Sequence, residues 1–162
     1  MNDKTRIVRD YQDADKQAVL KVYNSAILES HRFLEENVRL QQRNLMEESI
    51  DDSTNKALVL EENGHVVGFA TFITETAIAG FFIDPSLKAR GLGRYLIEYI
   101  QSKKKEISLV VYKRNTRGVR FYRNNGFRQT NKKYEKDANQ EYLEMTWRAA
   151  RFRNKRPLSM DS

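Results

Sequence analysis

The sequence contains no cysteine, and this absence excludes several kinds of site at once. Without thiols the chain has no disulfides, no thiolate zinc site and no cysteine nucleophile. It has two histidines, His31 and His65, which are too few to suggest a metal cluster. We therefore expect a protein without a bound metal.

Long apolar runs are missing as well. No stretch has the length of uninterrupted apolar residues that a membrane-spanning helix requires. The first residues, Met1 to Arg6, lack the apolar core of a signal peptide. These absences predict a cytoplasmic protein with no membrane partner.

Positive charge is in excess. The net charge of the 162 residues is +7, while 40% hydrophobic and 31% charged residues are typical of one soluble globular domain. A basic balance fits an anionic ligand, an acidic partner or nucleic acid, and does not choose among them. Part of the excess lies in residues 149–162, which carry Pro157 and no periodicity. We expect a domain at 1–148 and a basic, mobile tail at 149–162.

Apolar periodicity predicts the order of elements as β-α-α-β-β-β-α-β-α-β-β. Strands are expected at 5–9, 56–60, 65–73, 77–83, 107–112, 127–134 and 141–147, and helices at 13–29, 35–49, 92–100 and 116–125. A turn at Glu62-Asn63-Gly64 joins two strands, and short connections among three strands predict an antiparallel meander. A strand, a crossover helix and a further strand predict one parallel pair. The fold class is therefore α/β, with a mixed, mostly antiparallel sheet and helices on both faces.

The most informative stretch runs from Ala79 to Ile100 and reads as strand, glycine loop and helix. Free backbone N–H groups and the helix dipole at such a helix start favour an anion. Gly91 and Gly93 let a ligand approach the backbone, and Lys88, Arg90 and Arg94 add positive charge. The loop predicts a phosphate or pyrophosphate site, with a plain tight turn as the alternative. Position 96 is Leu, so the dinucleotide-binding fingerprint is not matched, and the Gly-Lys-Ser/Thr of a Walker loop is absent.

Two segments together resemble a known family. Asp84-Pro85 followed by Lys88-x-x-Gly91-x-Gly93 is similar to the acetyl-CoA loop of the GNAT N-acetyltransferases. The stretch from Leu109 to Phe127, with Asn115, Phe121-Tyr122 and Gly126-Phe127, is similar to a second segment of that family. Lys88 departs from the pattern, which usually has Gln or Arg there. The loop His31-x-Phe33 after the first helix resembles a small bacterial branch, some of whose members acetylate protein lysines.

The resemblance implies a GNAT-like sheet whose parallel pair is splayed, so that the pantetheine arm of acetyl-CoA pairs with an exposed strand edge. It implies acetyl-CoA as co-substrate and no metal. The residues implied to bind the co-substrate are Phe82, Ile83, Lys88, Arg90, Gly91, Leu92, Gly93, Arg94, Asn115 and Tyr122. A backbone N–H near Phe82 is implied to stabilise the oxyanion. Asn115 has an alternative role as the N-cap of the helix that follows.

For catalysis, the resemblance implies that Tyr122 gives a proton to the CoA thiolate, because a phenol stays protonated at neutral pH. Its alternative role is that of an aromatic core residue. His31 is a candidate to receive the proton of the amine and, with Phe33, to bind the acceptor; the alternative for His31 is a loop residue with a local hydrogen bond. No general base is identified, because Glu75, the nearest acid, fits an exposed strand end.

The expected function is transfer of the acetyl group of acetyl-CoA to a primary amine of a protein lysine, a protein N-terminus or a small molecule. The alternative is a CoA-binding sensor or scaffold without turnover. Nucleic acid is not expected as a partner, because the basic tail lacks interleaved aromatic residues. The chain is expected to be a monomer or a homodimer.

Overall fold

The computed structural model describes residues 5–52, 54, 56–87 and 90–152. The strands are β1 (Arg6–Asp10), β2 (Ala57–Glu62), β3 (His65–Phe72), β4 (Ile78–Ile83), β5 (Glu106–Tyr112), β6 (Arg128–Glu135) and β7 (Gln140–Arg148). The α-helices are α1 (Lys16–Ser30), α2 (Glu36–Asp51), α3 (Leu92–Lys103) and α4 (Thr116–Asn124). Single 3-10 turns lie at Asp13–Asp15, Pro85–Leu87 and Ala150–Phe152.

The predicted order of helices and strands is confirmed, and most ends lie within one or two residues of their predicted positions. The hairpin turn between β2 and β3 is also confirmed, because Asn63 and Gly64 have φ angles of 53° and 82°. No helix in the described part of the chain is both long and apolar enough to cross a membrane. The predicted boundary at residue 148 stays a prediction, since 153–162 lie outside the described residues.

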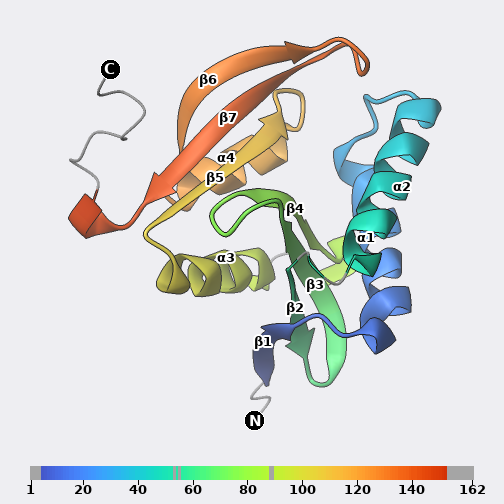
Figure 1. The fold of residues 1–162 in the computed structure, drawn as a ribbon, viewed down its shortest axis with the longest axis vertical. Coiled ribbons are helices and arrows are strands. Elements are labelled where there is room, and N and C mark those ends of the chain that lie inside the picture. The colour runs from blue at the N-terminus through green and yellow to red at the C-terminus, as the bar shows by residue number, and fades with distance from the viewer. Residues whose placement is uncertain (1–4, 53, 55, 88–89, 153–162) are drawn as a thin grey trace.

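The strands form two antiparallel sheets, with the orders β1-β2-β3-β4 and β5-β7-β6 (Figure 1). The expected parallel pair of β4 and β5 is therefore wrong. In the described residues the two sheets meet at one isolated parallel bridge between Ala77 and Ser108, where the Ser108 N–H donates to the Thr76 carbonyl at 2.8 Å. Beyond this bridge a cavity lined by both strands takes the place of a ladder.

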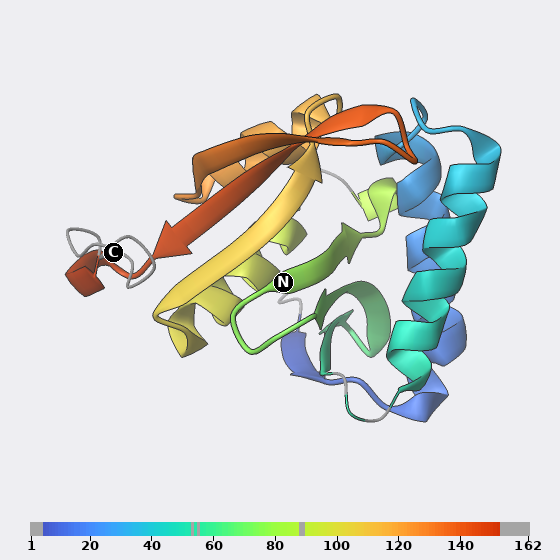
Figure 2. The ribbon, with the colours of Figure 1, turned by 45° about the horizontal axis from the view of Figure 1, so that its top comes forward.

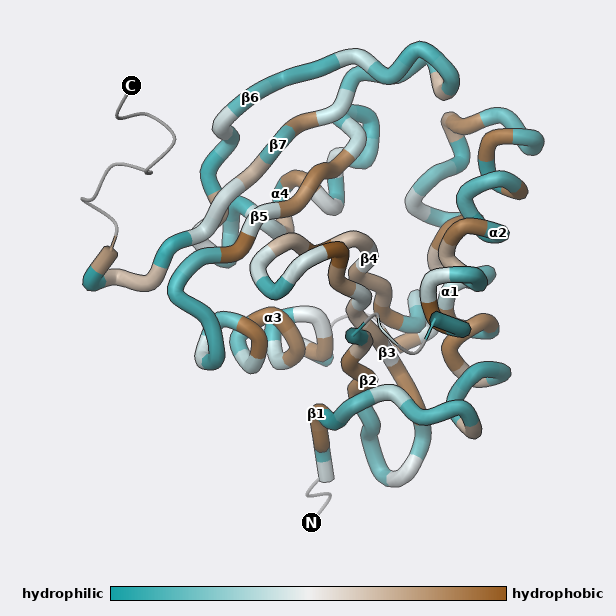
Figure 3. The backbone as a smooth tube through the Cα atoms, viewed as in Figure 1, coloured by the Kyte–Doolittle hydropathy of each residue, from teal (hydrophilic) through white to brown (hydrophobic). Residues whose placement is uncertain are grey.

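Helices cover both faces of the first sheet, as predicted (Figures 1 and 2). On one face α1 packs on β2 and β3 around Val19, Val59 and Phe69, which are almost fully buried. On the other face a larger core joins α3, α4 and both sheets through side chains such as Leu96 and Ile107. Apolar residues concentrate in these contacts, while the outer strand β6 is mostly hydrophilic (Figure 3).

The hairpin of β6 and β7 reaches across to the start of α2 (Figure 2). A small cluster forms there, in which Ala138 of the hairpin is buried with Leu34 and Val38. Phe33 and Tyr112 pack against the same cluster. The two sheets are therefore tied together at this end as well as at the Ala77–Ser108 bridge.

Candidate active site

The glycine loop opens α3 toward a large cavity. Gly91 is the N-cap of α3 and has a φ of 71°, a left-handed conformation that glycine adopts without cost. At Gly93 an added Cβ would lie 3.0 Å from Cε1 of Phe121, so only a glycine leaves this packing undisturbed. Gly91, Leu92 and Gly93 line a cavity of about 1240 Å³. The start of α3 can therefore hold a pyrophosphate group. We call this cavity the donor cavity.

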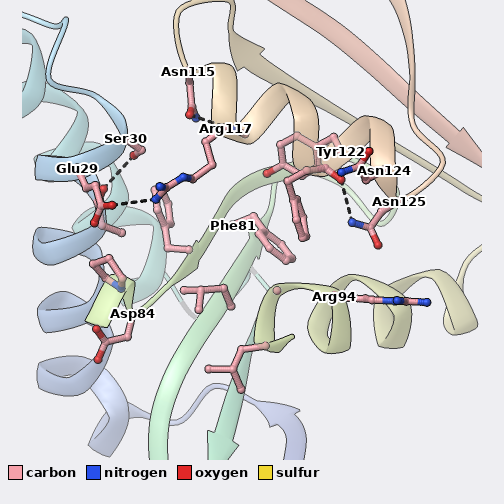
Figure 4. A pocket seen from close by; sticks show the side chains of 18 of the residues that line it. Glu29, Ser30, Phe81, Asp84, Arg94, Asn115, Arg117, Tyr122, Asn124 and Asn125 are labelled. Carbon is pink, nitrogen blue, oxygen red and sulfur yellow. Dashed lines mark hydrogen bonds and ion pairs between the residues drawn. The ribbon is translucent and has the colours of Figure 1, made fainter. Parts of the chain in front are cut away.

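Three of the arginines that line the donor cavity, Arg90, Arg94 and Arg117, are paired with carboxylates. Arg94 Nε lies 2.7 Å from Oε1 of Glu98, and Arg90 Nη1 lies 3.0 Å from Oε1 of Glu62. Arg117, at the start of α4, makes a 2.8 Å contact with Glu29 of α1 across the cavity (Figure 4). The predicted cofactor residue Lys88 lies outside the described residues. Backbone N–H groups, more than unpaired cations, therefore characterise the loop.

A second cavity, of about 760 Å³, lies between β4 and β5 and is bounded by α1 and α2; it is called the acceptor cavity below. The two cavities share a set of lining residues, namely His31, Phe81, Phe82, Asn115 and Tyr122. Ile83 lines only the donor cavity. Phe33 lines neither, and its ring packs instead against Tyr112, 5.6 Å between centroids. The structure thus brings the predicted site residues together, apart from Phe33 and the undescribed Lys88.

Tyr122 is a buried aromatic residue on α4 (Figure 4). Its ring centroid lies 5.3 Å from that of Phe121 and 5.5 Å from that of Phe127. Burial raises the pKa of its phenol above the usual range. No described residue forms a hydrogen bond with the hydroxyl. Tyr122 therefore combines packing in the core with a protonated hydroxyl where the two cavities meet.

His31 follows the last residue of α1. Its Nδ1 lies 2.7 Å from Oγ of Ser30, and its ring lies 5.6 Å from the ring of Tyr112. Burial lowers the pKa of His31 to about 4, because the charged imidazolium is disfavoured away from water. At neutral pH the ring is uncharged, and the lowered pKa makes it a weak proton acceptor. The local hydrogen bond that was the alternative for His31 is also present.

Asn115 is the N-cap of α4, which confirms its alternative role. Its Oδ1 accepts the Gly118 N–H at 3.1 Å. An added Cβ at Gly118 would lie 2.6 Å from Nδ2 of Asn115, so the glycine makes room for the cap. Because Oδ1 serves the cap, Nδ2 is the atom with which Asn115 can donate a hydrogen bond to a ligand.

Sequence reasoning missed a polar group in the acceptor cavity. Tyr112 of β5 donates to Oε2 of Glu135 at 3.0 Å and accepts from Nε2 of Gln42 at 2.6 Å. Among the described residues that line this cavity, Glu135 is the only carboxylate. These residues come from α2, β5 and β6, so no local sequence pattern signals that they meet.

The chain is similar to known proteins over most of its length. Residues 11–149 match the family described as the acetyltransferase (GNAT) domain. The peptidyl-lysine N-acetyltransferase YiaC of Escherichia coli is 26% identical over 121 residues, covering 75% of this chain and 82% of YiaC. Another peptidyl-lysine N-acetyltransferase, YjaB of Salmonella typhimurium, is 22% identical over 135 residues, covering 83% of this chain and 92% of YjaB.

Solved structures share the fold. The solution structure of apo YjaB from Escherichia coli superimposes with a TM-score of 0.78 at 21% identity, covering 88% of this chain and 97% of that one. The ribosomal-protein-S18-alanine N-acetyltransferase of Escherichia coli superimposes with a TM-score of 0.65 at 17% identity, covering 89% and 94% of the two chains. With the family model matching most of its length, the chain belongs to the GNAT family of acetyl-CoA-dependent N-acetyltransferases.

Proposed function

We propose that this protein transfers the acetyl group of acetyl-CoA to the side-chain amine of a protein lysine by direct attack. The observation that carries the proposal is that the donor and acceptor cavities share His31, Phe82 and Tyr122. A thioester entering from one side and an amine entering from the other would meet beside these residues. Holding the two reactants there removes much of the entropic part of the barrier.

The chain would hold acetyl-CoA mainly through its backbone. N–H groups at Gly91 to Gly93 would face the pyrophosphate, because they begin α3 and line the donor cavity. The outer edge of β4 at Phe81 to Ile83 lines the donor cavity and has no strand partner on the side of β5 among the described residues, so it is available to the amides of the pantetheine arm. Asn115 Nδ2 would add a side-chain hydrogen bond.

In the transfer, the amine nitrogen forms a bond with the thioester carbon, and the carbon–sulfur bond breaks. A backbone N–H of β4 near Phe82 would stabilise the oxyanion. Tyr122 would donate its proton to the departing thiolate and recover one from solvent. The proton lost by the amine would pass to water, directly or relayed through His31, whose lowered pKa means that it would not retain the proton. This loss balances the proton that the thiol retains.

Two features of the acceptor cavity and the similarity to known enzymes support a lysine. Its outer wall includes exposed Leu45, Val110 and Tyr134, which suit the aliphatic stem of a lysine side chain. Glu135 supplies one negative charge for an approaching ammonium. The similarity to peptidyl-lysine N-acetyltransferases points to the same class of acceptor.

The test is to incubate the purified protein with acetyl-CoA and peptides that carry either a lysine with a blocked N-terminus or a free N-terminus without lysine. We expect release of the CoA thiol and acetylation of the lysine peptide, located by mass spectrometry. Transfer to the free N-terminus alone would contradict the lysine acceptor. Binding of acetyl-CoA without transfer to any amine would instead support the sensor alternative.

A further inference from the structure

Glu62 is a buried carboxylate that belongs to neither cavity. It is the last residue of β2 and is 5% exposed. A carboxylate is charged in such a place only where cations compensate for the lost hydration. The role of this carboxylate therefore depends on the cationic side chains that contact it.

Two arginines from distant parts of the chain converge on Glu62. Arg6, its direct partner across the β1–β2 pair, places Nε 3.0 Å from Oε2. Arg90, which precedes the N-cap of α3, places Nη1 3.0 Å from Oε1. Each carboxylate oxygen thus holds one guanidinium, and one of the two comes from the glycine loop.

A further set of contacts fastens the same loop to β1. Nη2 of Arg6 donates to the backbone carbonyl of Arg90 at 2.7 Å. The hydroxyl of Tyr95, in the first turns of α3, donates to the carbonyl of Arg6 at 3.2 Å. The guanidinium of Arg6 also lies 5.7 Å from the centre of the Tyr95 ring. The start of α3 is therefore held against β1 from both sides of Gly91.

The contact to the Arg90 carbonyl sets the direction of a neighbouring N–H group. The peptide unit that joins Arg90 to Gly91 is planar and trans, so its carbonyl and its N–H point in opposite directions. The carbonyl points toward Arg6, which does not line the donor cavity, whereas Gly91 does. The Gly91 N–H is therefore turned away from Arg6, at a residue that lines the donor cavity.

We propose that Glu62 is a positioning residue for acetyl-CoA: it holds Arg6 and Arg90 so that the glycine loop presents its N–H groups to the pyrophosphate. Arg90 then acts as a fixed part of the loop, with its charge compensated by Glu62. This inference goes beyond the proposed lysine acceptor, because it concerns only how the co-substrate is bound.

Positioning and simple electrostatics predict opposite results for Glu62→Gln. Removing a negative charge beside an anion site, and releasing two guanidiniums, would by electrostatics alone tighten the binding of CoA. If positioning dominates, the loop loses its anchor and CoA binds more weakly, by about tenfold, which corresponds to the loss of roughly one hydrogen bond to the charged pyrophosphate. The sign of the change therefore separates the two explanations.

Glu61 provides a matched control on the same strand. Its Oε2 accepts from Nε of Arg9 at 3.2 Å, and Arg9 also pairs with Asp15, far from the glycine loop in sequence. Glu61→Gln removes the same chemical group and breaks an arginine pair between the same two strands. We expect it to lower thermal stability without changing the affinity for CoA.

The experiment is calorimetric titration of wild type, Glu62→Gln, Glu62→Asp and Glu61→Gln with CoA, well below each melting temperature. We expect both Glu62 variants to bind about tenfold more weakly, with a raised KM for acetyl-CoA and a nearly unchanged kcat at saturation. The Asp side chain in Glu62→Asp keeps the negative charge but is too short to reach both guanidiniums. If Glu62→Gln fails to fold, the CoA affinity of Glu62→Asp alone tests whether Glu62 positions the loop. Wild-type affinity in the folded Glu62 variants, or tighter binding by Glu62→Gln, would overturn the proposal. Because binding is read directly, a failure of lysine acetylation would not be mistaken for a failure of this inference.

Discussion

Replacing Tyr122 by Phe tests the chemistry with little disturbance of the structure. The substitution keeps the ring, whose centroid lies 5.3 Å from Phe121, 5.5 Å from Phe127 and 6.1 Å from Phe81. The lost hydroxyl has no hydrogen-bond partner among the described residues, so no buried group is orphaned. We therefore expect the free energy of unfolding to change by less than about 1 kcal/mol.

The expected loss is in kcat. General acids typically contribute about 10²- to 10⁴-fold, and a thiolate leaves readily, so the lower end, about 100-fold, applies. The KM for acetyl-CoA should change less than about twofold, because the hydroxyl would act only as the carbon–sulfur bond breaks. Burial holds the pKa of Tyr122 above its usual range, so the phenol stays protonated and the wild-type rate should show no alkaline decline from this group near neutral pH.

The assay is steady-state release of the CoA thiol at saturating amine, paired with calorimetric titration of acetyl-CoA. Tyr99→Phe is the control, since Tyr99 also lies on a helix but lines neither cavity. A kcat for Tyr122→Phe within threefold of wild type would refute the acid role. Equal losses of kcat and acetyl-CoA affinity would refute it as well, since they would indicate a packing defect.

Three further predictions follow from the same geometry. Glu135→Gln should raise the KM for the amine about fivefold, the value of a partly exposed ion pair, and leave the KM for acetyl-CoA unchanged; an unchanged amine KM would remove Glu135 from acceptor binding. The pKa of His31 is about 4 in the folded protein and 6.5 when exposed, so the unfolded chain binds the proton first as pH falls. Wild type should therefore lose about 2 kcal/mol of stability between pH 7 and pH 5 that His31→Gln keeps, measured by urea unfolding, and parallel curves would contradict the burial of this ring. Gly68→Ala should destabilise by about 2 kcal/mol, since its Cβ would lie 2.5 Å from Cδ1 of Ile83 and 3.0 Å from the carbonyl of Phe82; an unchanged urea midpoint would contradict this close packing.

Most helices, strands and turns could be predicted from the sequence, because each depends mainly on residues that are neighbours in the chain. The apolar stripe of α3, from Leu92 to Ile100, and the Asn63-Gly64 turn each follow from neighbouring residues. The separation of β4 from β5 was implied only as a splay, through the family resemblance, and the local sequence pattern did not predict two separate sheets. A strand, helix and strand predict a parallel ladder, but whether a ladder or a cavity lies between the strands depends on tertiary packing.

The residues of the candidate site also fall into two groups, those that the sequence predicted and those that it did not. The glycine loop and the Asn115 cap are short motifs, so the sequence reveals them. Glu135 meets Tyr112 and Gln42 only through the fold, from three separate elements. The sequence predicted Glu62 only as part of the hairpin turn with Asn63 and Gly64. Its burial depends on two arginines, 56 and 28 residues away in sequence.

The open edge of β4 beside the donor cavity gives the co-substrate a second role, which is to stabilise the folded protein. Beyond the Ala77–Ser108 bridge the two sheets share no ladder in the described residues, so a bound donor would act as a removable strand that closes the seam. Amide hydrogen exchange along this edge would then slow when CoA is added, and at a hundredfold excess over Kd the bound ligand adds about 2.7 kcal/mol to global stability. The supply of acetyl-CoA would thereby govern how long the folded enzyme resists proteolysis as well as how fast it works.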